Sequence, residues 1–335
     1  MPPLTRHPIF YSPTHPGSEE LDANQQALVD DINRRLASGA LTMERVPCLC
    51  GSDEFDMVAS LDRYRIVQDT VLCRKCGLMQ SQPRMTEESL IWFYGSDAYR
   101  ELYGGARQLP HTPDKFERQA RSCASRGEAI AAHLDLSSIN AVAEVGCGAG
   151  WNLWSFHQAG KRVIGCDYSP ALTEAGRAAG MDIRQGVAER ALAGETADLL
   201  LLSHVVEHFR DPIGEVRQLL SLLSPRYVYI EVPDVDSFCL GTLQSAHNYT
   251  FSKATLVTAM AKAGLAVMAE IPRGIHFAIL FRVEAPSAPL PDLGGEYARV
   301  AAVIRRYERR ERIKGWLEGL GLLSAARRIA SLLRR

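Results

Sequence analysis

Apolar runs alternate with amphipathic stretches from Asn140 to about residue 284. An apolar run of four to eight residues between turn signals predicts a buried strand, and the longer stretches with helical spacing predict helices. The predicted strands begin at Ala141 and continue at 162–166, 182–185, 197–203, 226–232, 265–271 and 275–283. This alternation predicts an α/β fold with a mostly parallel sheet.

The last two predicted strands are joined only by Pro272, Arg273 and Gly274. A parallel connection needs a crossover of a dozen or more residues, so this pair must form an antiparallel hairpin. We therefore expect a doubly wound, mostly parallel sheet whose last strand is reversed.

The chain before and after this region divides into further segments. We expect an irregular lead-in over 1–44 with a short helix at 25–36, and an aromatic-rich helical connector over 83–111. The main domain is placed at 112–285, with a helix from Pro113 to about His133. Residues 286–335 are expected to form a helical, basic tail.

Three glycines at alternate positions follow the first predicted strand, in Glu144-Val-Gly146-Cys147-Gly148-Ala149-Gly150. A glycine loop between a strand and a helix is where an α/β sheet holds a nucleotide-like ligand. A dinucleotide fingerprint needs a further glycine where this chain has Trp151, whose bulk would block the approach of a pyrophosphate. A nicotinamide cofactor is therefore disfavoured.

The pattern Glu-x-Gly-x-Gly-x-Gly resembles the first motif of class I S-adenosylmethionine-dependent methyltransferases, which have a Rossmann-like fold. The resemblance covers about residues 112–284, including the reversed last strand. It implies S-adenosyl-L-methionine as cofactor. Roles in cofactor binding would fall to Glu144 at the methionine amino end, the loop residues Gly146, Cys147, Gly148 and Gly150, Asp167 at the ribose hydroxyls with its neighbour Tyr168, Glu189 near the adenine, and Ser203 at the end of the fourth strand.

Transfer to a hydroxyl also requires a base near the carboxyl ends of the fourth and fifth strands. His204 and His208 follow the fourth strand, and His247 follows the fifth. We take His247 as the first candidate base, with His204 and His208 as alternatives; structural packing is an equally good account of any single histidine. The run from His204 to His208 also matches a zinc-peptidase motif, which would require a long helix here.

The segment after the fourth strand narrows the choice of acceptor. The segments typical of base-amino and cytosine-carbon methyltransferases are missing, since this chain has Ser203-His-Val-Val. Sugar carbon-methylating enzymes carry Tyr-His-Glu-His…Phe-Ser, of which Gln244-Ser-Ala-His247…Phe251-Ser252 lacks the tyrosine and the acid. We therefore predict oxygen methylation of a sugar or related small molecule. Methylation of ribosomal or other RNA and a non-catalytic cofactor-binding scaffold remain alternatives.

Two cysteine pairs precede the main domain: Cys48 with Cys50, and Cys73 with Cys76, each followed by glycine. Such paired turns aim four thiolates at one ion, so we predict a zinc ribbon over 45–82 with strands near 55–59 and 64–72. Four thiolates leave no open position, and the Zn²⁺ would be structural. The alternative is four free cysteines in a reduced cytosol. A zinc ribbon before such a domain resembles sugar methyltransferases and a ribosomal-RNA guanine methyltransferase.

The net charge of −1 gives no global basic field, so nucleic acid is not the expected main partner. Residues 297–335 are an exception, with eleven Lys or Arg against three Glu. Leu322, Ala326, Ile329 and Leu333 lie at helical spacing there, which suggests a basic amphipathic helix that contacts a membrane or a partner. No signal or membrane-spanning run is apparent, so we expect a cytoplasmic protein. The oligomeric state is not determined by the sequence.

Overall fold

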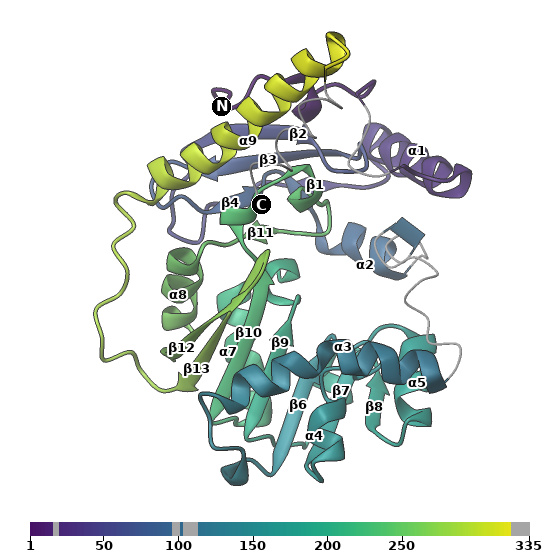
Figure 1. Cartoon of the computed structure of the whole chain (residues 1–335), viewed down its shortest axis with the longest axis vertical. Helices are drawn as coiled ribbons and strands as arrows, with labels where there is room; N and C mark the ends of the chain where they lie inside the picture. The colour runs from purple at the N-terminus through teal and green to yellow at the C-terminus, as the bar shows by residue number, and fades with distance from the viewer. Residues whose placement is uncertain (16–19, 96–100, 103–112, 323–335) are drawn as a thin grey trace. The chain divides into compact units, whose positions relative to one another are not determined.

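The structure is a computed structural model that describes residues 1–15, 20–95, 101–102 and 113–322. These residues form two compact units. The first unit combines the described residues of Met1–Trp92, Val235–His247 and the chain from Leu293 onward. The second combines the described residues of Phe93–Asp234 and Asn248–Asp292 (Figure 1).

The second unit contains a sheet of seven strands in the order β12-β13-β10-β9-β6-β7-β8. The strands are β6 (Ala141–Val145), β7 (Arg162–Asp167), β8 (Asp182–Gln185), β9 (Leu199–Ser203), β10 (Tyr227–Pro233), β12 (Leu265–Arg273) and β13 (His276–Val283). The pairs among β6 to β10 are parallel. The predicted α/β class with a mostly parallel sheet is therefore confirmed.

The predicted hairpin is also confirmed. β13 lies between β10 and β12 and is antiparallel to both. β12 reaches two residues closer to the turn than we expected and ends at Arg273, which pairs with His276. β13 begins at His276, one residue later than expected, and His276 is in register with Pro233 at the end of β10.

Helices connect the strands of the second unit, and some of them begin at side-chain caps. They are α3 (Pro113–Ala131), α4 (Trp154–Gln158), α5 (Pro170–Ala178), α6 (Ala188–Ala191), α7 (Pro212–Leu223) and α8 (Lys253–Lys262); β11 (Tyr249–Thr250) is a short additional strand. The side chains of Ser169, Asp211 and Ser252 accept hydrogen bonds from the first turns of α5, α7 and α8. Such caps satisfy backbone N–H groups that have no partner within the helix.

The core of the second unit packs α3, α4 and α5 against one face of the sheet. Fully buried side chains on this face include Val142, Leu199 and Leu280, which belong to one cluster with Phe156 of α4. The alternate strand positions, such as Leu200, are buried as well. A parallel sheet covered on both faces explains why its strands read as continuous apolar runs in the sequence.

The first unit is built on an antiparallel sheet in which β2 (Phe55–Leu61) pairs with β3 (Val67–Cys73), and β3 with β4 (Met79–Ser81). Two short strands, β1 (Met43–Glu44) and β5 (Arg84–Met85), pair with each other. The helices are α1 (Ala23–Ser38), α2 (Glu87–Gly95) and α9 (Glu296–Gly319). α1 contains the helix that we predicted in the lead-in, and β2 and β3 contain most of the two strands predicted between the cysteine pairs.

The last described helix, α9, folds together with the beginning of the chain. Val300, Ala301 and Ile304 of α9 are buried in one cluster with Phe10 and Leu72, which lies over β2 and β3 (Figure 1). The helix is also fastened by polar contacts, because Glu308 accepts hydrogen bonds from the backbone N–H groups of Arg6 and His7 at 2.6 and 2.8 Å. The described parts of the expected lead-in and of the tail from Leu293 onward thus belong to one unit, which also includes Val235–His247. The sequence does not reveal this, because contacts so far apart in the chain leave no local pattern.

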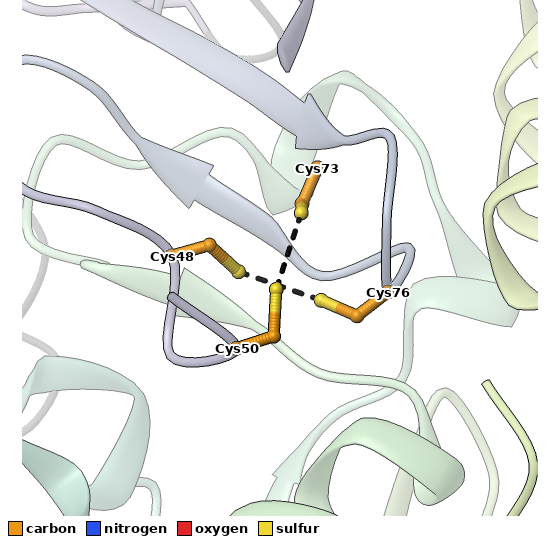
Figure 2. A group of neighbouring side chains, drawn as sticks. All are labelled: Cys48, Cys50, Cys73 and Cys76. Carbon is orange, nitrogen blue, oxygen red and sulfur yellow. Dashed lines mark hydrogen bonds between the residues drawn. The ribbon is translucent and has the colours of Figure 1, made fainter. Parts of the chain in front are cut away.

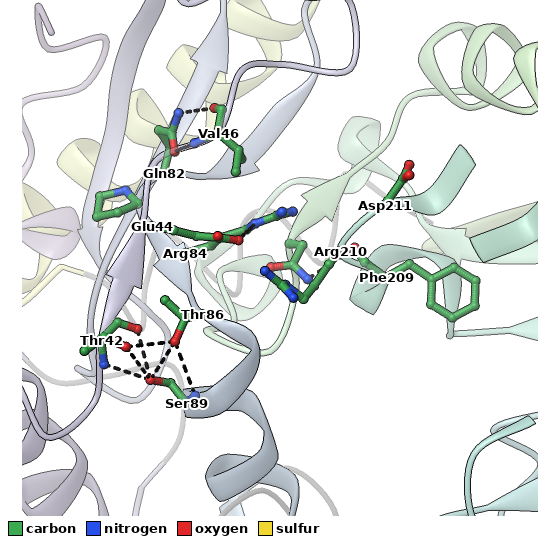
Figure 3. Close-up of polar contacts among 12 residues, drawn as sticks. Thr42, Glu44, Val46, Gln82, Arg84, Thr86, Ser89, Phe209, Arg210 and Asp211 are labelled. Carbon is green, nitrogen blue, oxygen red and sulfur yellow. Dashed lines mark hydrogen bonds and ion pairs between the residues drawn. The ribbon is translucent and has the colours of Figure 1, made fainter. Parts of the chain in front are cut away.

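The start of α2 is held by a small hydroxyl cluster (Figure 3). Ser89 accepts a hydrogen bond from the backbone N–H of Thr42 at 2.7 Å and donates one to its carbonyl at 3.0 Å. The Thr86 and Thr42 hydroxyls lie 2.8 Å apart. Most of the expected connector beyond Gly95 lies outside the described residues, as do Ala326, Ile329 and Leu333 of the predicted amphipathic helix. Among the described helices, none is long and apolar enough to cross a membrane.

Candidate active site

The glycine loop lies at the carboxyl end of β6, next to β9, where the strand order reverses direction. Ligands of open α/β sheets bind at this switch point. Gly146 and Gly150 both have positive φ angles, of 67° and 80°. A Cβ atom at Gly146 would lie 2.7 Å from Val205, and one at Gly150 would lie 2.9 Å from Met181. The loop therefore requires glycine for both conformation and space.

Glu144 is buried beneath this loop and has one unsatisfied oxygen. Asn152 donates a hydrogen bond to its Oε1 at 2.6 Å, whereas Oε2 has no hydrogen-bond partner within the described structure. Burial raises the pKa of Glu144 to about 8. A buried carboxylate oxygen without a donor suits a cationic group such as the amino group of a methionine moiety.

Asp167 lies at the end of β7 and contacts the backbone of the glycine loop. Its carboxylate accepts hydrogen bonds from the backbone N–H groups of Gly148 at 3.0 Å and Ser169 at 2.8 Å. These contacts fix the carboxylate beside the glycines, where a ribose would be reached from the second strand. The neighbouring Tyr168 is 59% exposed.

The other predicted cofactor residues surround the same loop. Cys147 is buried, and its Sγ would lie 2.6 Å from a Cβ atom at Gly165 of β7. Glu189 is exposed on α6, and Ser203 ends β9. The site thus combines a loop whose glycines leave room for a ligand, an acid with one unpaired oxygen (Glu144), and an acid held in place by backbone N–H groups (Asp167). This set fits S-adenosylmethionine, while the individual contacts stay predictions.

His204 directly follows β9 in a left-handed conformation, with φ of 57°. Its Nδ1 lies 3.4 Å from Glu207 and its Nε2 lies 3.4 Å from Glu231. Burial alone would lower the pKa of His204, but the two carboxylates raise it to about 9. His204 therefore carries a proton at neutral pH.

Glu231 organises this cluster and was missed by the sequence reasoning. It is buried in β10, where Arg126 of α3 binds both of its oxygens at 2.8 Å. Tyr229 donates a third hydrogen bond at 2.6 Å. Burial would raise the pKa of Glu231, but the bonds from His204 and Arg126 hold it well below its usual range. A lone acid inside an apolar strand was the available signal, because such a charge requires partners.

Asn152 joins the two parts of the site. It donates to Glu144 at 2.6 Å and accepts a hydrogen bond from Arg126 at 3.2 Å, and Arg126 in turn binds Glu231. The predicted cofactor acid is thereby linked to the histidine cluster through a continuous chain of hydrogen bonds. Neither Asn152 nor Arg126 belongs to a motif that the sequence would single out.

His276, at the start of β13, completes the cluster. Its ring centre lies 4.4 Å from that of His204. Burial and the neighbouring His204 lower the pKa of His276. Nitrogen and oxygen atoms of His204, Glu231 and His276 lie within 4.8 Å of one another, a spacing that could hold a metal ion. Two guanidinium groups, those of Arg126 and Arg273, already contact the same carboxylate, so a further cation is disfavoured.

The two remaining histidine candidates, His208 and His247, belong to different units. His208 ends a short 3-10 helix (Val206–His208), and its Nδ1 lies 3.2 Å from the Tyr94 hydroxyl. The zinc-peptidase alternative needs its two histidines on one long helix, which this segment does not form. His247 belongs to the first unit and is buried, with its carbonyl accepting a hydrogen bond from Ser81. Its catalytic role stays a prediction.

The four cysteines of the first unit converge, as Figure 2 shows. The Sγ atoms of Cys48 and Cys76 lie 3.4 Å apart, and those of Cys50 and Cys73 lie 3.7 Å apart. All four lie within 4.8 Å of one another. Tetrahedral Zn–S bonds of about 2.3 Å place sulfur atoms about 3.8 Å apart, so the arrangement fits zinc. The short Cys48-x-Cys50 spacing is accommodated by a turn in which Gly51 donates to the Cys48 carbonyl at 2.7 Å.

Comparisons with known proteins bear on the second unit. Residues 116–270 match the family model described as "Methyltransferase domain". A search of curated protein sequences finds no match.

Solved structures that resemble this chain include three methyltransferases. Human N-acetylserotonin methyltransferase, solved with S-adenosylmethionine, is 15% identical, with a TM-score of 0.45 over 58% of this chain and 62% of its own length. Mitomycin 7-O-methyltransferase is 19% identical, with a TM-score of 0.41 over 56% and 64%. A possible histamine N-methyltransferase from Thermotoga maritima is 21% identical, with a TM-score of 0.40 over 51% and 96%. The chain thus spans less than two thirds of the first two proteins.

The family match covers the strands that carry Glu144, the glycine loop, Asp167, His204 and Glu231. Its extent agrees with the region whose motif resembles the first motif of class I enzymes. Residues 116–270, just under half of this chain, therefore match a methyltransferase domain.

Proposed function

We propose that the enzyme transfers the methyl group of S-adenosylmethionine to a hydroxyl of a saccharide or a related small molecule. The bound cofactor supplies an electrophilic methyl group on a sulfonium. The methionine amino end of the cofactor would be held by Glu144 and its ribose by Asp167. The loop from Gly146 to Gly150 would let the backbone approach the methionine part. The remaining task of the protein is to align the acceptor oxygen and to remove its proton.

The observation that supports a hydroxyl acceptor is the pair of histidines at the carboxyl end of β9 and the start of β13. His204 already holds a proton at neutral pH because two carboxylates surround it. His276 has a lowered pKa, so its ring is neutral at pH 7 and can accept a proton. In this scheme a bond forms between the acceptor oxygen and the methyl carbon, the sulfur–carbon bond breaks, and the hydroxyl proton passes to a ring nitrogen of His276.

His247 remains the alternative base. It lies in Val235–His247, which precedes the strand β11 along the chain and belongs to the first unit. Its role and that of His276 are distinguished by their variants. Loss of turnover in His276→Gln with retained cofactor affinity supports His276, whereas loss confined to His247→Gln supports the residue chosen from the sequence.

We also propose that Cys48, Cys50, Cys73 and Cys76 bind one Zn²⁺ as a zinc ribbon. The sulfur separations fit a tetrahedral site, and four thiolates leave no position for water or substrate. The zinc would therefore stabilise the first unit and take no part in methyl transfer.

The test is to incubate the full chain with cofactor labelled in its methyl group and with separate carbohydrate and RNA fractions of a cell extract. Label that appears in a carbohydrate product and resists mild base, as an ether does, supports the proposal. Label in RNA, together with RNA binding that weakens steeply with salt, would replace it with the RNA alternative. Cofactor binding without transfer of the methyl group to either fraction would favour the alternative of a non-catalytic cofactor-binding scaffold.

A further inference from the structure

The second half of α9 presents a face that the described residues leave uncovered. Ile313, Trp316 and Leu320 are 48%, 65% and 53% exposed. They are three and four positions apart, so they share one side of the helix. Ile313 lies nine positions after the buried Ile304. Nine positions rotate the side chain by about 900°, or two and a half turns, which places Ile313 on the side opposite the core.

Basic side chains continue this face toward the start of the helix. Arg309 and Arg306 lie four and seven positions before Ile313, on the same side, and both are exposed. The three nearest acids point elsewhere. Glu318 is exposed but lies five positions after Ile313, a rotation of about 500° that places it on the other side of the helix. Glu308 is buried and accepts hydrogen bonds from the Arg6 and His7 backbone. Glu311 is partly buried and lies 3.6 Å from Lys314. The outer face is therefore cationic and apolar at once.

We propose that this face of α9, defined by Arg306, Arg309, Ile313, Trp316 and Leu320, binds peripherally to an anionic lipid bilayer. A bilayer surface offers negative headgroups to the arginines and an apolar boundary to the three large side chains. Tryptophan favours this interface because its ring is apolar and its N–H is polar.

Other binding partners would complement only the charge or only the apolar side chains of this face. A second copy packed parallel to the first would bring arginines against arginines, and an antiparallel copy would press them against the apolar side chains, where their charges leave water without an acid to pair with. A nucleic acid would pair with the arginines, but its phosphate backbone gives no apolar contact to Ile313 or Leu320. Of these three surfaces, the bilayer matches both the charge and the apolar side chains.

The experiment is flotation of the full chain with vesicles of phosphatidylcholine alone or with about 30% phosphatidylglycerol, at low and high salt. We expect binding only to the anionic vesicles, weakened by salt. The double variant Ile313→Gln with Trp316→Gln should bind anionic vesicles at least about tenfold more weakly than the parent. The same is expected of Arg306→Gln with Arg309→Gln. The matched control is Ile91→Gln, which changes an isoleucine that is 69% exposed on α2.

Three results would overturn the proposal. One is that the full chain does not bind anionic vesicles at low salt. Another is that both double variants bind as strongly as the parent, which would assign the binding to another part of the chain. The third is a dimer by light scattering that the Trp316 variant converts to a monomer, which would make this face an interface between two copies. Circular dichroism of each variant shows whether α9 is retained.

Discussion

Arg126 and Glu231 form a buried, two-pronged ion pair, with Arg126 Nε and Nη2 each 2.8 Å from a different carboxylate oxygen. It joins α3 to the centre of the sheet. Glu231→Gln removes the negative charge but leaves Arg126 and His204 in place as poorly compensated cations. We expect the free energy of unfolding of the second unit to fall by about 3–5 kcal/mol. Chemical denaturation followed by circular dichroism measures this change.

Glu195→Gln is the matched control, because Glu195 contacts Arg162 and Arg184 near the surface. Exposed ion pairs contribute at most about 1 kcal/mol, so this variant should unfold almost as the parent does. Equal effects of the two substitutions would mean that the Arg126–Glu231 pair has no special importance for stability.

The protonated His204 predicts a loss of stability in mild base. Its pKa in the folded protein is about 9, above the ordinary value of 6.5. Its ion pairs therefore stabilise the fold fully below pH 6.5, and this contribution is lost as the pH rises through 9. We expect a decrease of about 2 kcal/mol between pH 6.5 and pH 9.5.

The variant His204→Gln isolates this effect, because other groups also titrate in that range. The difference in unfolding free energy between parent and variant should shrink as the pH rises. A difference that stays constant from pH 6.5 to 9.5 would show that His204 is not protonated in the folded protein.

Glu144 predicts that cofactor binding releases a proton. With a pKa of about 8, its carboxyl group is mostly neutral at pH 7 in the free enzyme. The amino group of the cofactor would favour the ionised form, so binding should release close to one proton and strengthen as the pH approaches 8. Calorimetric titrations with S-adenosylhomocysteine in buffers of different ionisation enthalpy count this proton. The Glu144→Gln variant should release none, and an unchanged count would remove Glu144 from the cofactor site.

Asp167 provides a separate test of the cofactor site. Asp167→Ala removes the proposed acceptor of the ribose hydroxyls and the loop contacts to Gly148 and Ser169. We expect S-adenosylhomocysteine to bind at least about tenfold more weakly, since hydrogen bonds to a charged group contribute about 1.5–3 kcal/mol each. Asp182→Ala, at the start of β8 and paired with Arg184, serves as control. Unchanged affinity in Asp167→Ala would refute the ribose assignment.

The sequence predicted the second unit well because its signals are local. Each strand is a short apolar run, α5, α7 and α8 begin at side-chain caps, and the glycine loop needs conformations that only glycine adopts easily, as at Gly146. The parallel sheet and its reversed strand follow from these signals and from the short connection near Gly274.

The histidine cluster was only partly predictable. His204 was a candidate because it follows a strand, but Glu231, Arg126 and His276 come from three other elements. Their roles depend on pairing across the sheet and on the packing of α3, which no local spacing encodes. In the same way, Glu308 reads as one charge in a basic tail, although it binds the backbone of Arg6 and His7.

The cysteine cluster yields the last prediction, which concerns the metal. Four thiolates with sulfur atoms 3.4 and 3.7 Å apart in pairs should hold one Zn²⁺ per chain, measured by plasma emission spectrometry. Cys76→Ser should lose the metal and destabilise the first unit, because a structural zinc binds only the folded arrangement. Cys239→Ser changes an exposed cysteine outside the cluster and should keep the full metal content. A purified parent with no zinc that also unfolds unchanged in a strong chelator would show that these four cysteines are packed as free thiols.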